Sequence, residues 1–211
     1  MPDSAPSVPS KVPADRRGAL VQAAYDLIAA EGFERLRTRD VAGRVGVNIA
    51  TLHYYFPTKE ALIAAVAEHL SFQFSTVRAP SESGVDPTAL DRLRQEFADS
   101  RFYGSERPEM VVVMQELALR ARRDPAVAAV VEPLKRYWRA SIAETVQAGL
   151  DEGVFRPGLG PEAAAGVITA ALWGVATLPL DPAGREHVYA AIEQWLAPEH
   201  GSSSEKEYPD G

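Results

Sequence analysis

The chain contains 211 residues and no cysteine, and its formal net charge is −7. The lack of cysteine excludes disulfides, cysteine nucleophiles and cysteine-ligated zinc sites, and it is typical of a reducing compartment. The acidic balance disfavours non-specific DNA binding, although residues 11–59 contain 8 Lys and Arg against 5 Asp and Glu, a net of +3. The length predicts a small piece and a larger one.

Both ends of the chain are expected to lie outside the fold. Residues 1–13 carry four prolines and no apolar signal-peptide core, which predicts a flexible arm. The polar residues 198–211 predict a disordered tail. The longest apolar stretch, 163–180, contains two glycines and Pro179, so we expect no membrane span and a cytoplasmic protein. Between the ends we expect two domains, at residues 14–60 and 61–197.

Residues 38–62 read TRDVAGRVGVNIATLHYYFPTKEAL. The Thr38 hydroxyl is expected to cap a helix that runs to about Val45, and Gly46 to close it in the left-handed conformation. Asn48 then caps a second helix. Two helices joined by so short a turn cross steeply and expose the second one, so the segment predicts a helix-turn-helix motif.

The second helix, over residues 49–56, has two different faces. At 100° per residue Leu52 and Phe56 point inward, toward the core. The outward face is small and polar, which suits a DNA major groove better than burial against apolar helices. It consists of Ala50, Thr51, His53 and Tyr54.

DNA contacts can be assigned along this segment. Thr58 is expected to cap a third helix, with Lys59 in its first turn, where an ammonium and free N–H groups together hold a phosphate. The expected phosphate contacts are Thr38, Arg39, Tyr54, Tyr55 and Lys59. The residues expected nearest the bases are Asn48, Ile49, Ala50, Thr51 and His53. Two readings stay open: Ile49 can contact bases or join the core, and His53 can be a solvated surface residue.

The segment resembles the DNA-binding half of the tetracycline-repressor (TetR) family of bacterial regulators. Upstream, the resemblance rests on Arg17, Ala23, Ala24, Gly32, Phe33, Thr38, Val41 and Ala42. Downstream, it rests on Leu52, Tyr54, Tyr55, Phe56, Lys59, Glu60 and Leu62. One departure is His53, where the family usually has a tyrosine. The alternative is a helical hairpin that only packs within a larger bundle.

Beyond Leu62 the pattern is helical throughout, which predicts an all-α protein of about nine helices. Further helices are expected over 58–77, from near Pro87, over 107–122, and from Asp124 to about Leu150. Pro133 is expected to kink or interrupt the longest of these, and Gly149 and Gly153 to end it. Two last helices are expected over 161–178 and 183–196.

These last two helices favour a dimer interface. Gly166, Ala170 and Gly174 lie four residues apart and form a ridge along which another helix can approach closely. The final helix contributes Val188, Ile192 and Trp195. Two such pairs about a two-fold axis make a four-helix interface, and the resemblance implies the same surface. The alternative is a core helix of a monomer.

Aromatic and methionine side chains of the middle helices are candidates for a small-molecule effector pocket, or equally for ordinary core. The candidates are Phe97, Phe102, Met110, Met114, Trp138, Thr145, Thr169 and Trp173.

The sequence therefore predicts a homodimeric repressor that binds a pseudo-palindromic operator and is released by a hydrophobic effector. An activator, a regulator controlled by a protein partner and, remotely, a helical-bundle enzyme are the alternatives. The four histidines have no metal-ligand spacing and no glycine-rich phosphate loop follows a strand, so we expect no catalytic residue, metal or cofactor.

Overall fold

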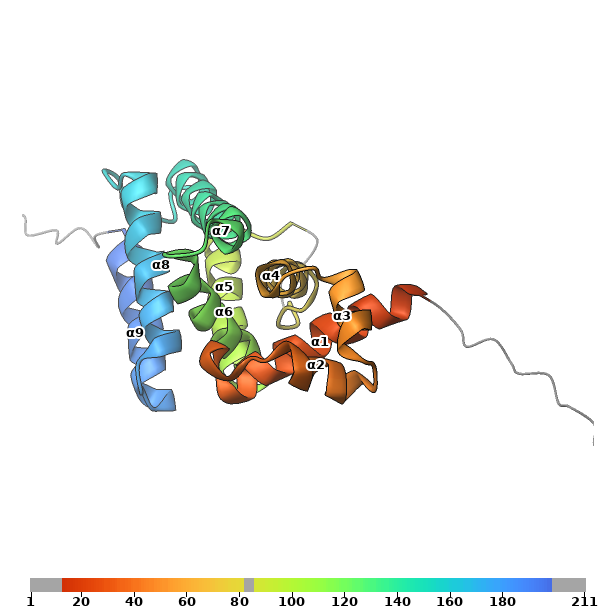
Figure 1. The fold of residues 1–211 in the computed structure, drawn as a ribbon. Helices are drawn as coiled ribbons and strands as arrows, with labels where there is room; N and C mark the ends of the chain where they lie inside the picture. Colours follow the sequence, from red (N-terminus) through yellow and green to blue (C-terminus); the bar gives the residue numbers. More distant parts are fainter. Residues whose placement is uncertain (1–12, 82–85, 199–211) are drawn as a thin grey trace, which may run out of the picture. The chain divides into compact units, whose positions relative to one another are not determined.

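The structure is a computed structural model that describes residues 13–81 and 86–198, with side chains from residue 16 onward. The arm and the tail expected from the sequence lie outside the described residues, apart from Pro13 and Pro198. Within the described residues the chain forms nine α-helices, one 3-10 turn and no strand, which confirms the all-α prediction (Figure 1). The elements are α1 (Pro13–Glu31), η1 (Phe33–Arg35), α2 (Thr38–Val45), α3 (Ile49–Tyr55), α4 (Lys59–Thr76), α5 (Ala89–Ser105), α6 (Pro108–Ala121), α7 (Pro125–Asp151), α8 (Pro161–Thr177) and α9 (Pro182–Leu196).

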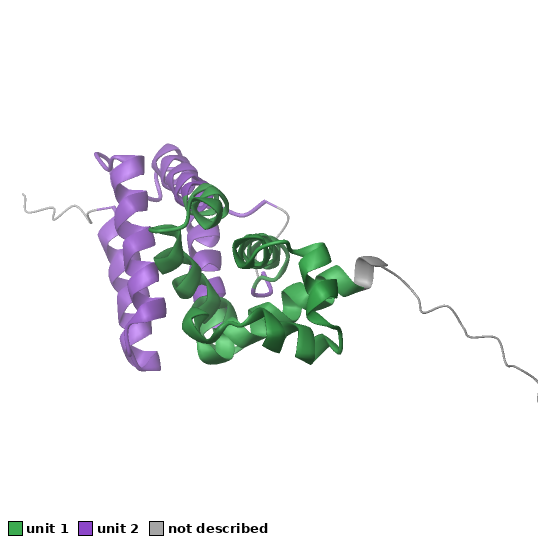
Figure 2. Ribbon diagram, viewed as in Figure 1, with its two compact units in different colours: residues 1–78, 103–135 green, residues 79–102, 136–211 purple. Residues whose placement is uncertain are grey.

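The helices are grouped in two compact units (Figure 2). Unit 1 comprises residues 1–78 and 103–135, and unit 2 comprises residues 79–102 and 136–211. The boundary expected after residue 60 does not coincide with this division. The physical reason is that α1 packs against α4 and α6 as well as α2, so both helices extend the N-terminal unit.

Unit 1 is built around the apolar face of α1. Leu20, Ala24 and Ile28 recur every four residues and are fully buried. Helices α4 and α6 cover them with their own buried stripes, which contain Leu62, Ile63, Val66, Val113 and Leu117. Each large aliphatic side chain buried in this way contributes about 1.5–3 kcal/mol, so α6 stabilises the core of unit 1 together with the helix-turn-helix segment.

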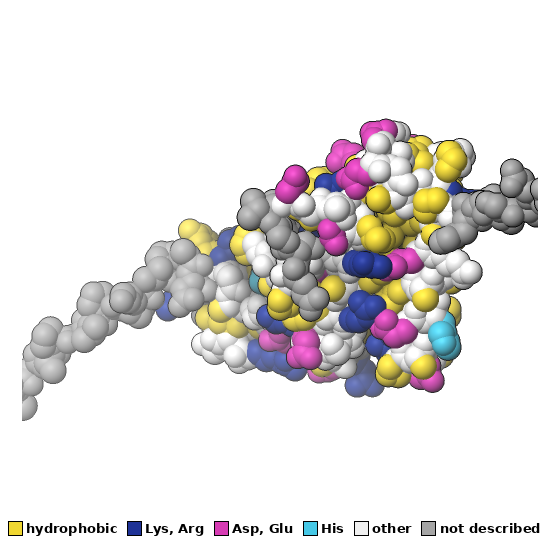
Figure 3. Space-filling view, turned by 180° about the vertical axis from the view of Figure 1, so that it is seen from behind, with side chains coloured by type: hydrophobic (Ala, Val, Ile, Leu, Met, Phe, Trp, Pro, Cys, Tyr) yellow, Lys and Arg dark blue, Asp and Glu magenta, His cyan; other side chains and the backbone are white. Residues whose placement is uncertain are grey.

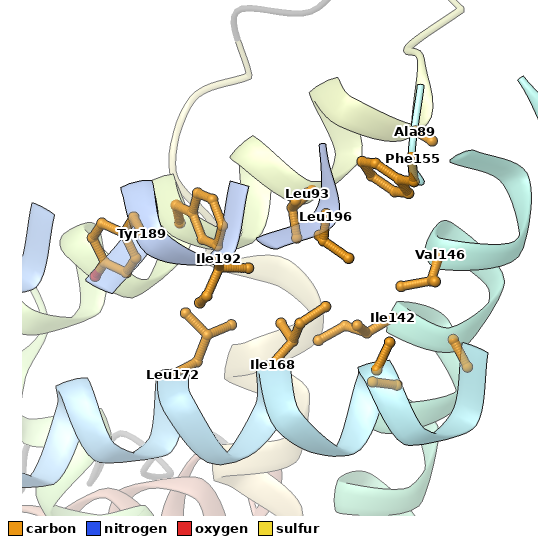
Figure 4. Packing of buried hydrophobic residues seen from close by; sticks show 14 of the residues in the cluster. Ala89, Leu93, Ile142, Val146, Phe155, Ile168, Leu172, Tyr189, Ile192 and Leu196 are labelled. Atoms are coloured by element: carbon orange, nitrogen blue, oxygen red, sulfur yellow. The ribbon is translucent and has the colours of Figure 1, made fainter. Parts of the chain in front are cut away.

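Unit 2 has its own core (Figure 4). Side chains of α5, α7, α8 and α9 meet in one cluster, in which Ile168 and Leu172 of α8 face Ile192 and Leu196 of α9. At the edge of α5 and α9 the Phe97 and Tyr189 rings stack with centroids 4.9 Å apart. Two salt bridges connect α5 with α9: Arg94 pairs with Glu193, and Arg101 pairs with Glu186.

Helix α7 departs from the sequence prediction at two positions. Pro133 lies inside α7 and does not interrupt it. Because proline has no N–H group, the Ala129 carbonyl lacks its helical hydrogen-bond donor. Both residues are exposed, and water can therefore donate to this carbonyl instead. Gly149 does not end it either and lies inside the helix. A Cβ at Gly149 would come within 2.0 Å of the Phe155 ring, so glycine is required there by packing. The chain turns after Asp151, at Gly153 with φ +72°.

Candidate DNA interface

The turn between α2 and α3 forms as the sequence predicts. Gly46 ends α2 in the left-handed conformation, with φ 71°. The Asn48 side-chain oxygen accepts the Thr51 N–H at 2.8 Å and its hydroxyl at 3.0 Å, which caps α3. Because the cap uses the oxygen, the Asn48 amide N–H groups stay available as donors.

Helix α3 presents a buried and an exposed face. Leu52 and Phe56 are almost completely buried, as expected. Tyr54 is 82% exposed and Ile49 is 41% exposed, so Ile49 is not part of the core. His53 and Ala50 are exposed and Thr51 and Tyr55 are partly exposed. The face expected to read DNA is therefore open.

The start of α2 differs from the prediction by one residue. Thr38 is the first helical residue, and the N-cap is Arg37, which makes no side-chain capping bond. Arg37 is extended (φ −118°), and its carbonyl accepts from the N–H groups of Asp40 and Val41. Thr38 therefore does not cap α2. At the start of α4 the prediction is confirmed, since the Thr58 hydroxyl oxygen accepts the Ala61 N–H at 3.1 Å.

The first turns of α2 and α4 line a surface depression of about 490 Å³ within unit 1. Its lining residues are Leu36, Arg37, Thr38, Arg39, Asp40, His53 and Lys59. Three cations face one carboxylate there, and helix N-termini add partial positive charge. The depression can hold an anion such as a backbone phosphate. The sequence prediction included Thr38, Arg39, His53 and Lys59 and missed Arg37, which the alternation of arginines at 35, 37 and 39 could have indicated.

Charges of both signs are mixed elsewhere on the visible surface. On the face shown in Figure 3, Lys and Arg side chains lie among Asp and Glu. Near the motif, Arg44 is 3.7 Å from Glu31, and the Arg17 guanidinium lies over the Phe56 ring. With an overall charge of −7, electrostatic attraction to DNA has to be local to a part of the surface that carries excess positive charge.

The ridge expected at a dimer interface lies on α8. One face of α8 is covered by the core of unit 2, whereas Ala170 and the neighbouring Val167 are exposed and Gly166 and Gly174 are partly exposed. A Cβ at either glycine would meet nothing closer than 3.9 Å. Val188 and Trp195 of α9 are half-buried. Ile192 differs, since it is 6% exposed and belongs to the core of unit 2, so it offers little surface to a second chain.

The eight effector-pocket candidates are divided between the two units. Met110 and Met114 belong to unit 1, and Phe97, Phe102, Trp138, Thr145, Thr169 and Trp173 belong to unit 2. Both threonine hydroxyls donate to carbonyls of their own helix, at 3.0 and 2.8 Å. The Trp138 indole N–H donates to Glu96 at 2.8 Å. Several candidates thus already have partners within unit 2.

The described residues contain neither a membrane-spanning helix nor a cluster of metal ligands. None of their helices has both the length and the apolarity that crossing a bilayer requires. No group of three or more His, Asp or Glu side chains in this part of the chain is arranged to hold a metal ion.

The chain is similar to known families of bacterial regulators in both its N-terminal and its C-terminal part. Residues 20–66 match the model for bacterial regulatory proteins of the tetR family, and residues 89–200 match the model for the C-terminal domain of BetI-type transcriptional repressors. The HTH-type transcriptional repressor KstR2 of Mycolicibacterium smegmatis is 30% identical over 156 residues, which are 74% of each chain.

Solved structures show the same fold. A TetR-family regulator from Rhodococcus sp. has a TM-score of 0.71 at 24% identity, covering 87% of this chain and 100% of that one. A transcriptional regulator from Saccharomonospora viridis, solved in complex with choline, has a TM-score of 0.74 at 20% identity, covering 86% and 95%. Together, the helix-turn-helix geometry and both family matches establish that this chain belongs to the TetR family of bacterial transcriptional regulators and is a DNA-binding repressor with a BetI-type C-terminal domain.

Proposed function

We propose that two copies of the chain place their α3 helices in successive major grooves of a pseudo-palindromic operator, about 34–36 Å apart. The observation that carries this proposal is the cationic depression between α2 and α4, next to the exposed face of α3. A phosphate held in the depression fixes the position of α3 relative to the bases. In this proposal the protein acts in the cytoplasm and is associated with the nucleoid when it is bound to DNA.

The proposed contacts follow from the chemistry of each side chain, either as a hydrogen-bond donor or as an apolar group. Phosphates are contacted by Thr38, Arg39, Tyr54, Tyr55 and Lys59, and by Arg37 in addition. Bases are read by the free amide of Asn48, by Ile49 and Ala50 through apolar contact, by the Thr51 methyl group, and by His53. The Thr51 hydroxyl is occupied by Asn48, which favours a role for its methyl group.

Dimerisation is proposed through α8 and α9. The ridge of Gly166, Ala170 and Gly174, which is exposed at Ala170 and partly exposed at both glycines, leaves room for the backbone of a partner helix, and Val167 adds an apolar side chain beside it. Val188 and Trp195 extend the surface on α9. A two-fold pairing of this surface gives a four-helix interface.

Release by a small effector is the last part of the proposal. The C-terminal segment matches repressors of the BetI type, and a structural neighbour was solved with choline bound. Phe102, Trp138 and Trp173 are half-buried aromatic side chains of unit 2 that suit an apolar ligand. The ligand must bind the released state more tightly than the DNA-bound state, typically by ~1–3 kcal/mol.

The experiment is selection from random duplex DNA at two salt concentrations, followed by sequencing. An enriched inverted repeat with half-sites about one helical turn apart supports the dimeric arrangement. Enrichment of a single half-site would refute it, and so would a folded protein that enriches no sequence in the presence or absence of added apolar compounds. A loss of the enriched complex on adding one compound identifies the effector class.

A further inference from the structure

Helix α6 contacts the DNA-binding segment from behind, through two polar side chains. Glu116 accepts a hydrogen bond from the backbone N–H of Phe33 at 3.1 Å, a contact that spans 83 positions in the sequence. One turn later, Arg120 lies 3.8 Å from Glu60 in the first turn of α4. Both contacts lie within unit 1, and each is made to a residue close in sequence to the lining of the depression described above: Phe33 precedes Leu36 by three positions, and Glu60 follows Lys59.

The Glu116 contact supplies a cap that the local sequence lacks. The 3-10 turn η1 begins after Gly32, which has φ 75° and no side chain with which to cap the first N–H groups. The carboxylate of Glu116, a residue of α6, caps the turn by accepting the Phe33 N–H. A charged acceptor makes a stronger hydrogen bond than a neutral one. Its other oxygen lies 3.5 Å from the place where a Cβ on Gly32 would be, so the carboxylate sits directly against this turn.

The capped turn leads directly into the DNA-contacting residues. Phe33 and Leu36 are buried, and the Leu36 N–H donates to the Phe33 carbonyl at 3.1 Å. Leu36 is already part of the depression, and Arg37, Thr38 and Arg39 follow it immediately. A displacement of Phe33 is therefore expected to shift Arg37, Thr38 and Arg39, the proposed phosphate contacts.

Arg120 makes the second contact between α6 and the DNA-binding segment. Its guanidinium Nε donates to Asp124 at 3.2 Å, and Asp124 is buried and caps α7 through the N–H groups of Ala126 and Val127. The guanidinium is thus held in place while it pairs with Glu60, the neighbour of Lys59. The pairing offsets a negative charge that would otherwise oppose a phosphate at Lys59.

We infer that Glu116 of α6 is a positioning residue for DNA binding: it holds η1 and the start of α2 in the geometry that the phosphate contacts require. This inference rests on the proposed DNA contacts of α2. It makes α6, which lies in the segment that matches the BetI-type C-terminal domain, a structural part of the DNA-binding surface.

The test compares full-length variants. Glu116→Ala removes the acceptor, whereas Glu116→Gln keeps a carbonyl oxygen that can still accept from Phe33. Glu109→Ala removes a carboxylate of the same helix that pairs locally with Arg107. Ile142→Val, in the core of unit 2, serves as a variant of lowered stability with an intact DNA-binding segment.

Two readouts separate positioning from general stability. In the free protein, the Phe33 amide should exchange with solvent about tenfold faster in Glu116→Ala than in the wild type, and not in Glu109→Ala. Affinity for the selected duplex should fall about tenfold, or about 1.4 kcal/mol, in Glu116→Ala. It should be restored mostly by Glu116→Gln and unchanged in Ile142→Val.

The opposite results overturn the inference. Unchanged Phe33 exchange in Glu116→Ala shows that the cap is absent, whether or not the protein binds DNA. Faster exchange with wild-type affinity shows that the cap does not position the contacts. A wild-type protein that binds neither the selected nor a random duplex contradicts the proposed function instead, and the exchange measurement still decides whether the cap exists.

Discussion

Replacing Lys59 with Ala removes one cation from the depression at the start of α4. Lys59 is partly exposed and is the first residue of α4, after the Thr58 cap, so alanine preserves the helix. Each phosphate contact contributes about 0.9 to the slope of log affinity against log salt, and a dimer loses two such contacts, or about 1.8. Between about 50 and 200 mM salt, that slope difference corresponds to a factor of about 12.

The loss of affinity caused by Lys59→Ala is therefore expected to depend on the salt concentration. The affinity deficit of Lys59→Ala should be largest at low salt and should shrink about 12-fold over that range, equally for selected and random duplexes. Fluorescence anisotropy with both duplexes measures it, and Lys59→Arg, which keeps the charge, should retain the wild-type slope. A slope equal to that of the wild type, or a loss confined to the selected duplex, would refute the phosphate role.

Three other changes probe the rest of the account. Gly149→Ala should lower the free energy of unfolding by about 1–3 kcal/mol, because its Cβ collides with Phe155; an unchanged melting temperature would contradict the packing at α7. Ala170→Leu, at an exposed position of α8, should leave the protomer folded but weaken the dimer in sedimentation experiments; a dimer of wild-type strength excludes this ridge from the interface. The hydrogen bond with Arg101 lowers the pKa of Glu186 from its ordinary 4.5. The ion pair therefore stabilises the fold fully above pH 4.5, and this stabilisation is lost as the pH falls through the lowered pKa of Glu186. Glu186→Gln should remove this part of the acid dependence of unfolding, and identical pH profiles of the free energy of unfolding would argue against the pair.

Local signals in the sequence predicted the elements that depend on neighbouring residues. Gly46, Asn48 and Thr58 each end or cap a helix through bonds to residues at most four positions away, and all three are found as expected. The prediction that Thr38 caps α2 was wrong by one position. The extended residue before the helix is Arg37, and Thr38 is the first helical residue.

Features that depend on how side chains pack in the folded chain were not predictable in this way. Gly149 reads as a helix breaker, but the Phe155 ring packs against its backbone and makes glycine the residue that fits inside α7. The packing of α6 on α1, with Glu116 at Phe33, extends the N-terminal unit beyond the boundary expected after residue 60. The residues around each position show no pattern that predicts these contacts, because the contacts form only when the chain folds.

The most direct test of the central claim uses selected duplexes in which single backbone phosphates are replaced by neutral methylphosphonates. Wild-type protein and Lys59→Ala are compared on each duplex, which forms a double-mutant cycle between the side chain and one phosphate. The account predicts one phosphate per half-site whose neutralisation weakens the wild type but has almost no further effect on Lys59→Ala. Additive losses at every phosphate would contradict the claim that the depression between α2 and α4 holds the DNA backbone.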